Sequence, residues 1–131
     1  MNLAVWTPRI LSVLRIITGL LFLEHGTGKL LGFPSSDHSA SSLLSLIGFQ
    51  GVLELAGGLL ILLGLFTRPV AFVLAGDMAV AYFMAHAPRS FYPTVNDGQL
   101  AILFCFVFLY LAFAGGGEWS VDEEIARSRS R

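Results

Sequence analysis

Acids, bases and an amide lie inside the long apolar stretches of this sequence. They are Glu24, His25, Lys29, Glu54, Asp77 and Gln99. A charged side chain at the centre of a membrane-spanning helix costs on the order of 2.5–3.5 kcal/mol, so such groups face protein or water and mark functional sites. Histidine is the side chain that carries protons near neutral pH, and a lysine holds anionic groups. The pattern therefore predicts a polar pocket inside a bundle of helices.

Four apolar stretches have to position these side chains, over residues 10–31, 47–66, 70–87 and 99–114. Hydrophobic residues make up 55% of the 131, charged residues 13%, and the mean hydropathy is +0.74. A spanning helix needs about 20 mostly apolar residues, and the stretches lack the alternation of barrel strands. We therefore expect an all-α integral membrane four-helix bundle, with residues 1–131 forming one domain and 118–131 a tail.

The placement of lysine and arginine predicts the orientation of this bundle. Only Lys29 and Arg89 would lie on one side, and the other side would carry Arg9, Arg15, Arg68, Arg127, Arg129 and Arg131. The side richer in lysine and arginine is the cytoplasmic one, so both termini are expected in the cytoplasm. The turn Thr67-Arg68-Pro69 is so short that the second and third helices must be antiparallel neighbours.

Helical periodicity places several of the polar residues on shared faces. Advancing by 100° per residue puts Arg15, Thr18, Phe22, His25 and Lys29 on one stripe of the first helix. Gly57 and Gly58 flank Glu54 on the second helix, with Gln50 and Gly51, so another backbone can come close to the carboxylate. His25 and Glu54 lie about seven residues from their helix ends, roughly 10 Å deep. We expect them at one level.

The third and fourth helices leave two interpretations open. The third helix carries a seam of small residues, Ala71, Ala75 and Ala79, and Asp77 lies between the last two of them. Asp77 can pair with Arg15 or Arg68, either as a structural ion pair or in a functional role. On the fourth helix, one stripe carries Gln99, Leu103, Phe106 and Tyr110. A polar head above aromatic rings suits a ring-bearing ligand, and the same spacing also occurs in ordinary core packing.

Composition and motifs exclude several classes of function. The net charge is −1 and no basic run lies outside the short tail, which gives nucleic-acid binding no support. The single cysteine, Cys105, excludes an intramolecular disulfide and a CxxC pair, so any redox chemistry needs a bound cofactor or a partner. His25, Glu54 and His86 have no metal-ligand spacing, and no metal site is predicted.

The residues resemble those of the DoxX family of small four-helix membrane proteins. The resemblance covers nearly the whole chain and is carried by Leu14-Arg15-Ile16, Gly19, Phe22, His25-Gly26, Lys29-Leu30, Glu54, Gly57-Gly58, Gly64, Arg68, Asp77-Met78 and the ending Gly115–Gly117, Trp119-Ser120-Val121-Asp122. The chain departs from the family at Asn96-Asp97-Gly98-Gln99, where a carboxylate is expected to open the last helix. An acid's role is therefore not transferred to Gln99.

The resemblance implies a multi-pass protein of the bacterial-type inner (plasma) membrane. Relatives resemble the small subunit of thiosulfate:quinone oxidoreductase or accompany redox and detoxification enzymes in membrane complexes. The recurrent polar pattern matches Arg15, His25, Lys29, Glu54, Arg68 and Asp77. The implied partners are the lipid bilayer, redox-enzyme subunits or a second copy of the chain.

Three functional hypotheses follow. The first is a membrane component of a redox, sulfur-linked or detoxification system whose pocket binds a quinone-like or other small ligand. His25 and Glu54 would handle protons, Arg68, Gly57 and Gly58 would be structural, and the ligand-binding residues would be Arg15, Lys29, Asp77, Gln99, Phe106 and Tyr110. The second is a non-catalytic assembly subunit, and the third a small proton-coupled transporter. The sequence requires no cofactor and does not decide whether the protein is an enzyme; if it is one, it is expected to be a quinone-linked oxidoreductase subunit.

Overall fold

The computed structural model describes residues 1–35, 40 and 42–131, and these residues form helices and connecting segments without strands. In chain order the helices are η1 (Leu3–Trp6), α1 (Thr7–Leu31), α2 (Leu46–Leu63), α3 (Thr67–Ala81), the π-helical turn η2 (Tyr82–His86), α4 (Pro93–Asn96), α5 (Gln99–Ala114) and α6 (Val121–Arg129). The expected all-α class is confirmed.

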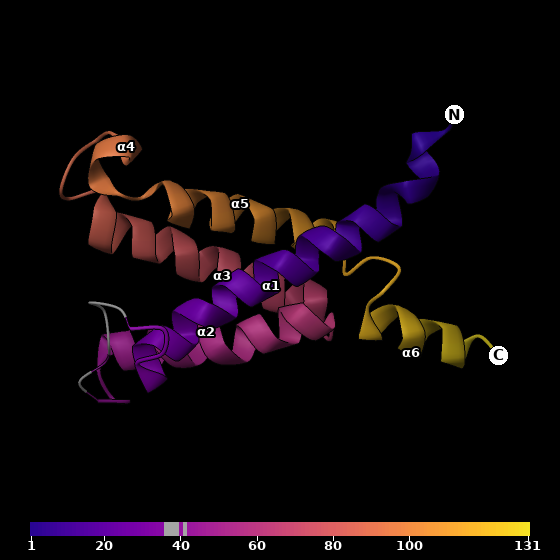
Figure 1. Cartoon of the computed structure of the whole chain (residues 1–131), viewed down its shortest axis with the longest axis horizontal. Helices are drawn as coiled ribbons and strands as arrows, with labels where there is room; N and C mark the ends of the chain where they lie inside the picture. The colour runs from indigo at the N-terminus through magenta and orange to yellow at the C-terminus, as the bar shows by residue number, and fades with distance from the viewer. Residues whose placement is uncertain (36–39, 41) are drawn as a thin grey trace.

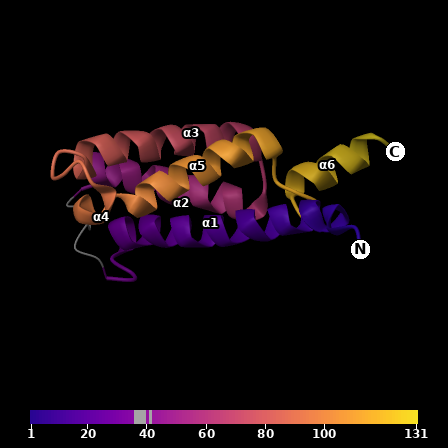
Figure 2. The same ribbon diagram turned by 90° about the horizontal axis from the view of Figure 1, so that it is seen from above.

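Helices in the described residues are long and apolar enough to cross a membrane at three places, Leu3–Leu31, Leu46–Leu63 and Thr67–His86. The fourth apolar helix, α5, has 16 residues, or roughly 24 Å at a rise of 1.5 Å per residue. These four helices run side by side, and both termini lie at the same end of the bundle (Figures 1 and 2). We call this the terminal end, and the opposite end, which carries α4 and the last turn of α1, the loop end. Which end faces the cytoplasm stays a prediction.

Close packing of α1 on α2 depends on glycines that bring two backbones together. A Cβ atom on Gly26 would lie 2.5 Å from the backbone nitrogen of Leu55, and a Cβ on Gly19 would lie 2.7 Å from that of Leu62. Gly58 makes the reciprocal approach to the backbone of α1. Small residues allow such contact where lipid removes the hydrophobic drive for association. The glycines therefore fix one antiparallel register between α1 and α2.

The bundle consists of two closely packed helix pairs. α1 packs along α2, α3 packs along α5, and α2 adjoins α3, whereas the backbones of α1 and α5 lie farther apart and these two helices meet through side chains (Figure 2). Gly57 faces the other pair, since a Cβ there would meet the side chain of Leu74 on α3. Inside the bundle, the ring of Phe22 packs edge-on against Phe104 and Phe108, with centroids 5.3 and 4.8 Å apart.

The turn between α2 and α3 lies three residues earlier than the sequence predicted. α2 ends at Leu63, and Gly64 (φ 71°) and Phe66 (φ 52°) adopt the left-handed conformation. Thr67-Arg68-Pro69, expected to be the turn, forms the first turn of α3 instead. A glycine just past a helix end provides a left-handed stop, and proline suits a first turn because no N–H is needed there.

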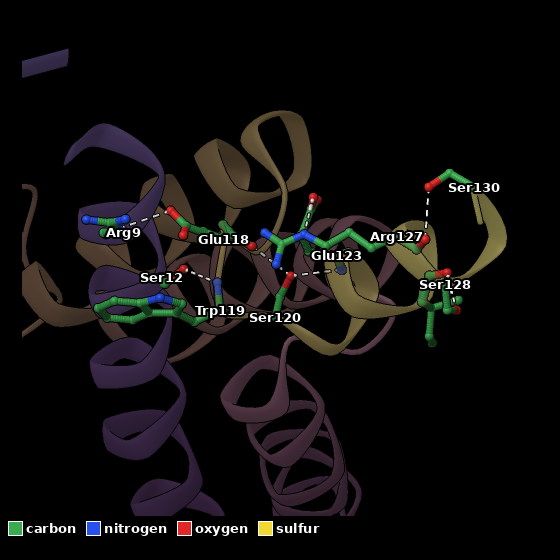
Figure 3. Close-up of polar contacts among 11 residues, drawn as sticks. Arg9, Ser12, Glu118, Trp119, Ser120, Glu123, Arg127, Ser128 and Ser130 are labelled. Carbon is green, nitrogen blue, oxygen red and sulfur yellow. Dashed lines mark hydrogen bonds and ion pairs between the residues drawn. The ribbon is translucent and has the colours of Figure 1, made fainter. Parts of the chain in front are cut away.

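Polar contacts fasten the C-terminal segment to the start of α1 (Figure 3). Arg9 Nε lies 3.2 Å from Glu118 Oε2, and the backbone N–H of Trp119 donates to Ser12 Oγ at 2.9 Å. The hydroxyl of Ser120 caps α6 by accepting the backbone N–H three residues further on, at 3.2 Å. The first and last segments of the chain thus meet at the terminal end.

Candidate functional site: a buried ion group beside a cavity

A buried ion pair joins α1 and α2 near the loop end. Lys29 Nζ lies 2.7 Å from Glu54 Oε1, and the two side chains are only 15% and 3% exposed. The glycine register brings them together, because Gly51 lies against Lys29 and Leu30 and thereby sets the last turn of α1 beside Glu54. The sequence predicted both residues inside the bundle. The structure identifies Lys29 as the direct partner of the carboxylate.

Asp77 belongs to the same group of charges. Leu74 of α3 lies against Gly57 of α2, and one turn nearer the loop end this register places Asp77 at the level of Glu54. The expected pairing with Arg15 or Arg68 is wrong, since neither arginine forms an ion pair with Asp77 in the described part of the chain. Both arginines are held by backbone carbonyls at the terminal end.

Arg15 is a structural clamp in this arrangement. The residue is 1% exposed, and its guanidinium donates to four carbonyl oxygens, those of Gly116 (2.9 Å), Ile61 (3.0 Å), Leu62 and Trp119 (2.8 Å). The carbonyls of a helix's last turn lack partners within the helix, and guanidinium offers five donors in a fixed plane. Arg15 thus serves the end of α2 and lines neither of the cavities described below.

Arg68 makes a comparable contact between α3 and α5. It donates from Nη1 to the carbonyl oxygen of Phe113, in the last turn of α5. The structural role expected for Arg68 stays a prediction. Arg15 and Arg68 thus each bind the end of a helix that lies far from them in the sequence.

A cavity of about 300 Å³ lies beside the ion group, between α1 and α5. It is lined by Leu21, Glu24, His25, Gly28, Lys29, Pro34, Leu100 and Phe104. Ligand sites in proteins typically have volumes of about 300–1,000 Å³ and a mostly apolar lining with a few polar groups. The cavity has that character, with Lys29, His25 and Glu24 as its polar groups.

His25 lies in the cavity wall, and the predicted aromatic stripe does not. The imidazole ring packs edge-on against Phe104, with centroids 5.9 Å apart. Phe106, Tyr110 and Gln99 are exposed on the outside of the bundle and do not line the cavity. α5 is apolar on every side, so helical periodicity gave no indication of which aromatic face turns inward.

The cavity at the terminal end is larger, about 800 Å³, and lies between the starts of α1 and α3, the glycine segment after α5, and α6. Its charged groups are bound by the protein itself. The Asp122 carboxylate accepts the backbone N–H groups of Phe66 and Thr67, both at 2.8 Å, and Arg127 lies 3.4 Å from Glu123. We therefore place the candidate ligand site in the smaller cavity.

Asn96 is a structural residue that sequence reasoning did not single out for a role. It is fully buried, its amide donates to the Ser90 carbonyl at 2.9 Å, and its Oδ1 accepts the Gly98 N–H at 2.8 Å. His86 Nδ1 lies 2.8 Å from the Asn96 carbonyl oxygen. The departure from the family pattern before α5 is thus a closed turn that fixes the loop end.

Within the described residues, no group of three His, Cys, Asp or Glu side chains is placed to hold a metal ion.

Apolar helices of spanning length, glycine-mediated packing and charges in the bundle interior define a multi-pass membrane protein of the inner-membrane type. The chain belongs to the DoxX family, which matches residues 10–87. It is 39% identical to a Haemophilus influenzae protein described as uncharacterized, covering 94% of this chain and 96% of that one. It is 32% identical to the Escherichia coli inner membrane protein YqjF, covering 84% and 87%. The Mycobacterium tuberculosis membrane protein Rv3486 is 25% identical, covering 92% and 83%. No solved structure matches the chain.

Proposed function

We propose that this DoxX protein is a ligand-binding membrane component of a redox or detoxification system, and that the cavity between α1 and α5 holds the ligand. The observation that carries the proposal is the position of Lys29. Its side chain lines the cavity and also pairs with buried Glu54. An ammonium group has three donors, and in the described structure Lys29 uses one of them, for Glu54. The others are available to a ligand.

The shape and chemistry of the cavity favour a small ring-bearing molecule with hydrogen-bond acceptors, such as a quinone. The volume of about 300 Å³ is at the lower end of the range for ligand sites. Phe104 supplies an aromatic surface, and Lys29 and His25 supply polar groups at the wall. His25 and Glu54 are the proposed proton-handling residues, with Glu54 reached through Lys29. The redox setting rests on the resemblance of DoxX proteins to redox-associated subunits.

Filling the cavity tests this proposal. Leu100 lines the cavity and Leu103, one turn further along α5, faces outward. Leu100→Trp is expected to weaken binding of decylubiquinone or menadione at least about tenfold, which is roughly 1.4 kcal/mol. Leu103→Trp is the matched control and should bind like the wild type. Equilibrium dialysis with the protein in lipid nanodiscs measures both.

Absence of saturable binding of either quinone to the wild-type protein, or equal binding by the two variants, would contradict the proposal. A protein that serves only to assemble a complex would give the first of these results. Recovery of folded protein, followed by size-exclusion chromatography, separates lost binding from lost structure.

A further inference from the structure

Two buried carboxylate oxygens near the cavity have no hydrogen-bond partner among the described residues. They are Glu54 Oε2 and Asp77 Oδ2. The residue Glu54 is 2% exposed, and its other oxygen is paired with Lys29. A buried polar group without a partner costs about 1–3 kcal/mol, and a charged one costs more. Such atoms in a native structure require an explanation.

Helix register places Glu54 and Asp77 at the same level of two neighbouring helices. Gly57 of α2 lies against Leu74 of α3. Because the two helices are antiparallel, moving about one turn toward the loop end from this contact leads to Glu54 on α2 and Asp77 on α3. Lys29 reaches the same place from α1.

The charges in this group do not balance when both acids are ionised. Lys29 contributes one positive charge, and the two carboxylates contribute two negative ones. α5, the other helix packed on α3, has no Asp, Glu, Lys, Arg or His between Gln99 and Ala114. Its titratable residues are Cys105, in an apolar stretch, and exposed Tyr110. An uncompensated charge among apolar helices is costly, and one proton on the carboxyl pair makes the group neutral.

We propose that Glu54, Asp77 and Lys29 form an intramembrane proton site that holds one exchangeable proton on the two carboxyl groups. The proton belongs to the pair, as is usual for strongly interacting acids, and it supplies a donor for oxygens that otherwise have none. The inference is independent of what the cavity binds. Lys29 connects the proton site to the cavity, whereas Phe22, Ile61 and Phe108, each at most 1% exposed, separate the interior from the terminal end.

Infrared difference spectroscopy of the full-length protein in lipid, at neutral pH and in H2O and D2O, tests this site. The wild type is expected to show the carbonyl stretch of a protonated carboxylic acid, shifted to lower frequency in D2O because the proton exchanges. Asp77→Asn and Glu54→Gln should each remove or displace the band. Asp97→Asn should leave it unchanged, because Asp97 is 73% exposed and paired with Arg89.

A wild-type spectrum with only ionised carboxylate bands would overturn the proposal, and so would a protonated band that survives both Asp77→Asn and Glu54→Gln. The wild-type result decides the first point even if a variant does not fold. Carboxylates satisfied by a trapped water or a metal cation would also give only ionised bands, so these alternatives count against a shared proton.

Discussion

Arg15 of α1 donates a 2.9 Å hydrogen bond from Nε to the carbonyl oxygen of Gly116, a residue 101 positions further along the chain. The same guanidinium binds the carbonyls of Ile61 and Leu62 at the end of α2. One side chain therefore connects the first helix, the second helix and the segment that follows the last span. Because Arg15 is buried, water cannot replace it as the hydrogen-bond donor to these carbonyl groups.

Replacement of Arg15 by methionine should lower the free energy of unfolding by on the order of 3 kcal/mol or more, because buried carbonyls that lose their donor each cost about 1–3 kcal/mol. Arg9→Met is the control on the same helix. Arg9 is 38% exposed in its pair with Glu118, and exposed pairs contribute about 0–1 kcal/mol. Denaturant titration in mixed micelles compares the two, and equal losses would contradict the clamp role.

Glycine positions on different sides of the bundle should respond oppositely to alanine. Gly26→Ala places a Cβ 2.5 Å from the Leu55 backbone nitrogen, and overpacking of this kind typically costs about 1–3 kcal/mol. Gly76 has nothing within 4 Å of its added Cβ, so Gly76→Ala should leave stability unchanged or raise it by up to about 1 kcal/mol through helix propensity. Thermal melts of both variants in one detergent provide the comparison. A neutral Gly26→Ala would mean that α1 and α2 do not pack in this register.

The pair Lys29 and Glu54 should show strong coupling in a double-mutant cycle. Removing one partner of a buried pair typically costs about 3–5 kcal/mol because the other charge stays buried and unpaired. Lys29→Met should therefore be more destabilising than the combined change Lys29→Met with Glu54→Gln. A cycle through Arg127→Gln and Glu123→Gln, an exposed pair, should give coupling of at most about 0.5 kcal/mol. Additive losses at Lys29 and Glu54 would argue against their ion pair.

The predicted orientation can be tested with single cysteines, because Cys105 is the only natural one. In a Cys105→Ala background, Asp97→Cys at the loop end should react with a membrane-impermeant maleimide applied to intact spheroplasts. Ser130→Cys at the terminal end should react only after the membrane is disrupted. The reverse pattern would place both termini outside and contradict the prediction from the lysine and arginine distribution.

The spans, the antiparallel pairing of α2 with α3 and the location of Lys29 and Glu54 in the bundle were all predictable from sequence. A long uninterrupted apolar stretch identifies a spanning helix. A charged residue within such a helix has to face the interior of the bundle or water. The glycines around Glu54 also indicated a close backbone approach. These features depend on local composition and on spacing within one helix.

The contacts that sequence reasoning missed depend on distant backbone or on register. Arg15 and Arg68 bind carbonyl groups, which every residue has, so no side-chain pattern reveals these partners. The level of Asp77 in the bundle follows from how α2 lies along α3, which the contact between Gly57 and Leu74 fixes only once the helices pack. Because α5 is apolar on all sides, the sequence did not show whether Phe104 or Phe106 faces the interior of the bundle.

The division into two tightly packed helix pairs has a mechanical consequence. The cavity lies between α1 and α5, which belong to different pairs, and on the opposite side α2 contacts α3, joined to it at the terminal end by the short turn at Gly64–Phe66. We expect a molecule that fills the cavity to press on α1 and α5, one helix from each pair, while the short turn at Gly64–Phe66 keeps the two pairs joined at the terminal end.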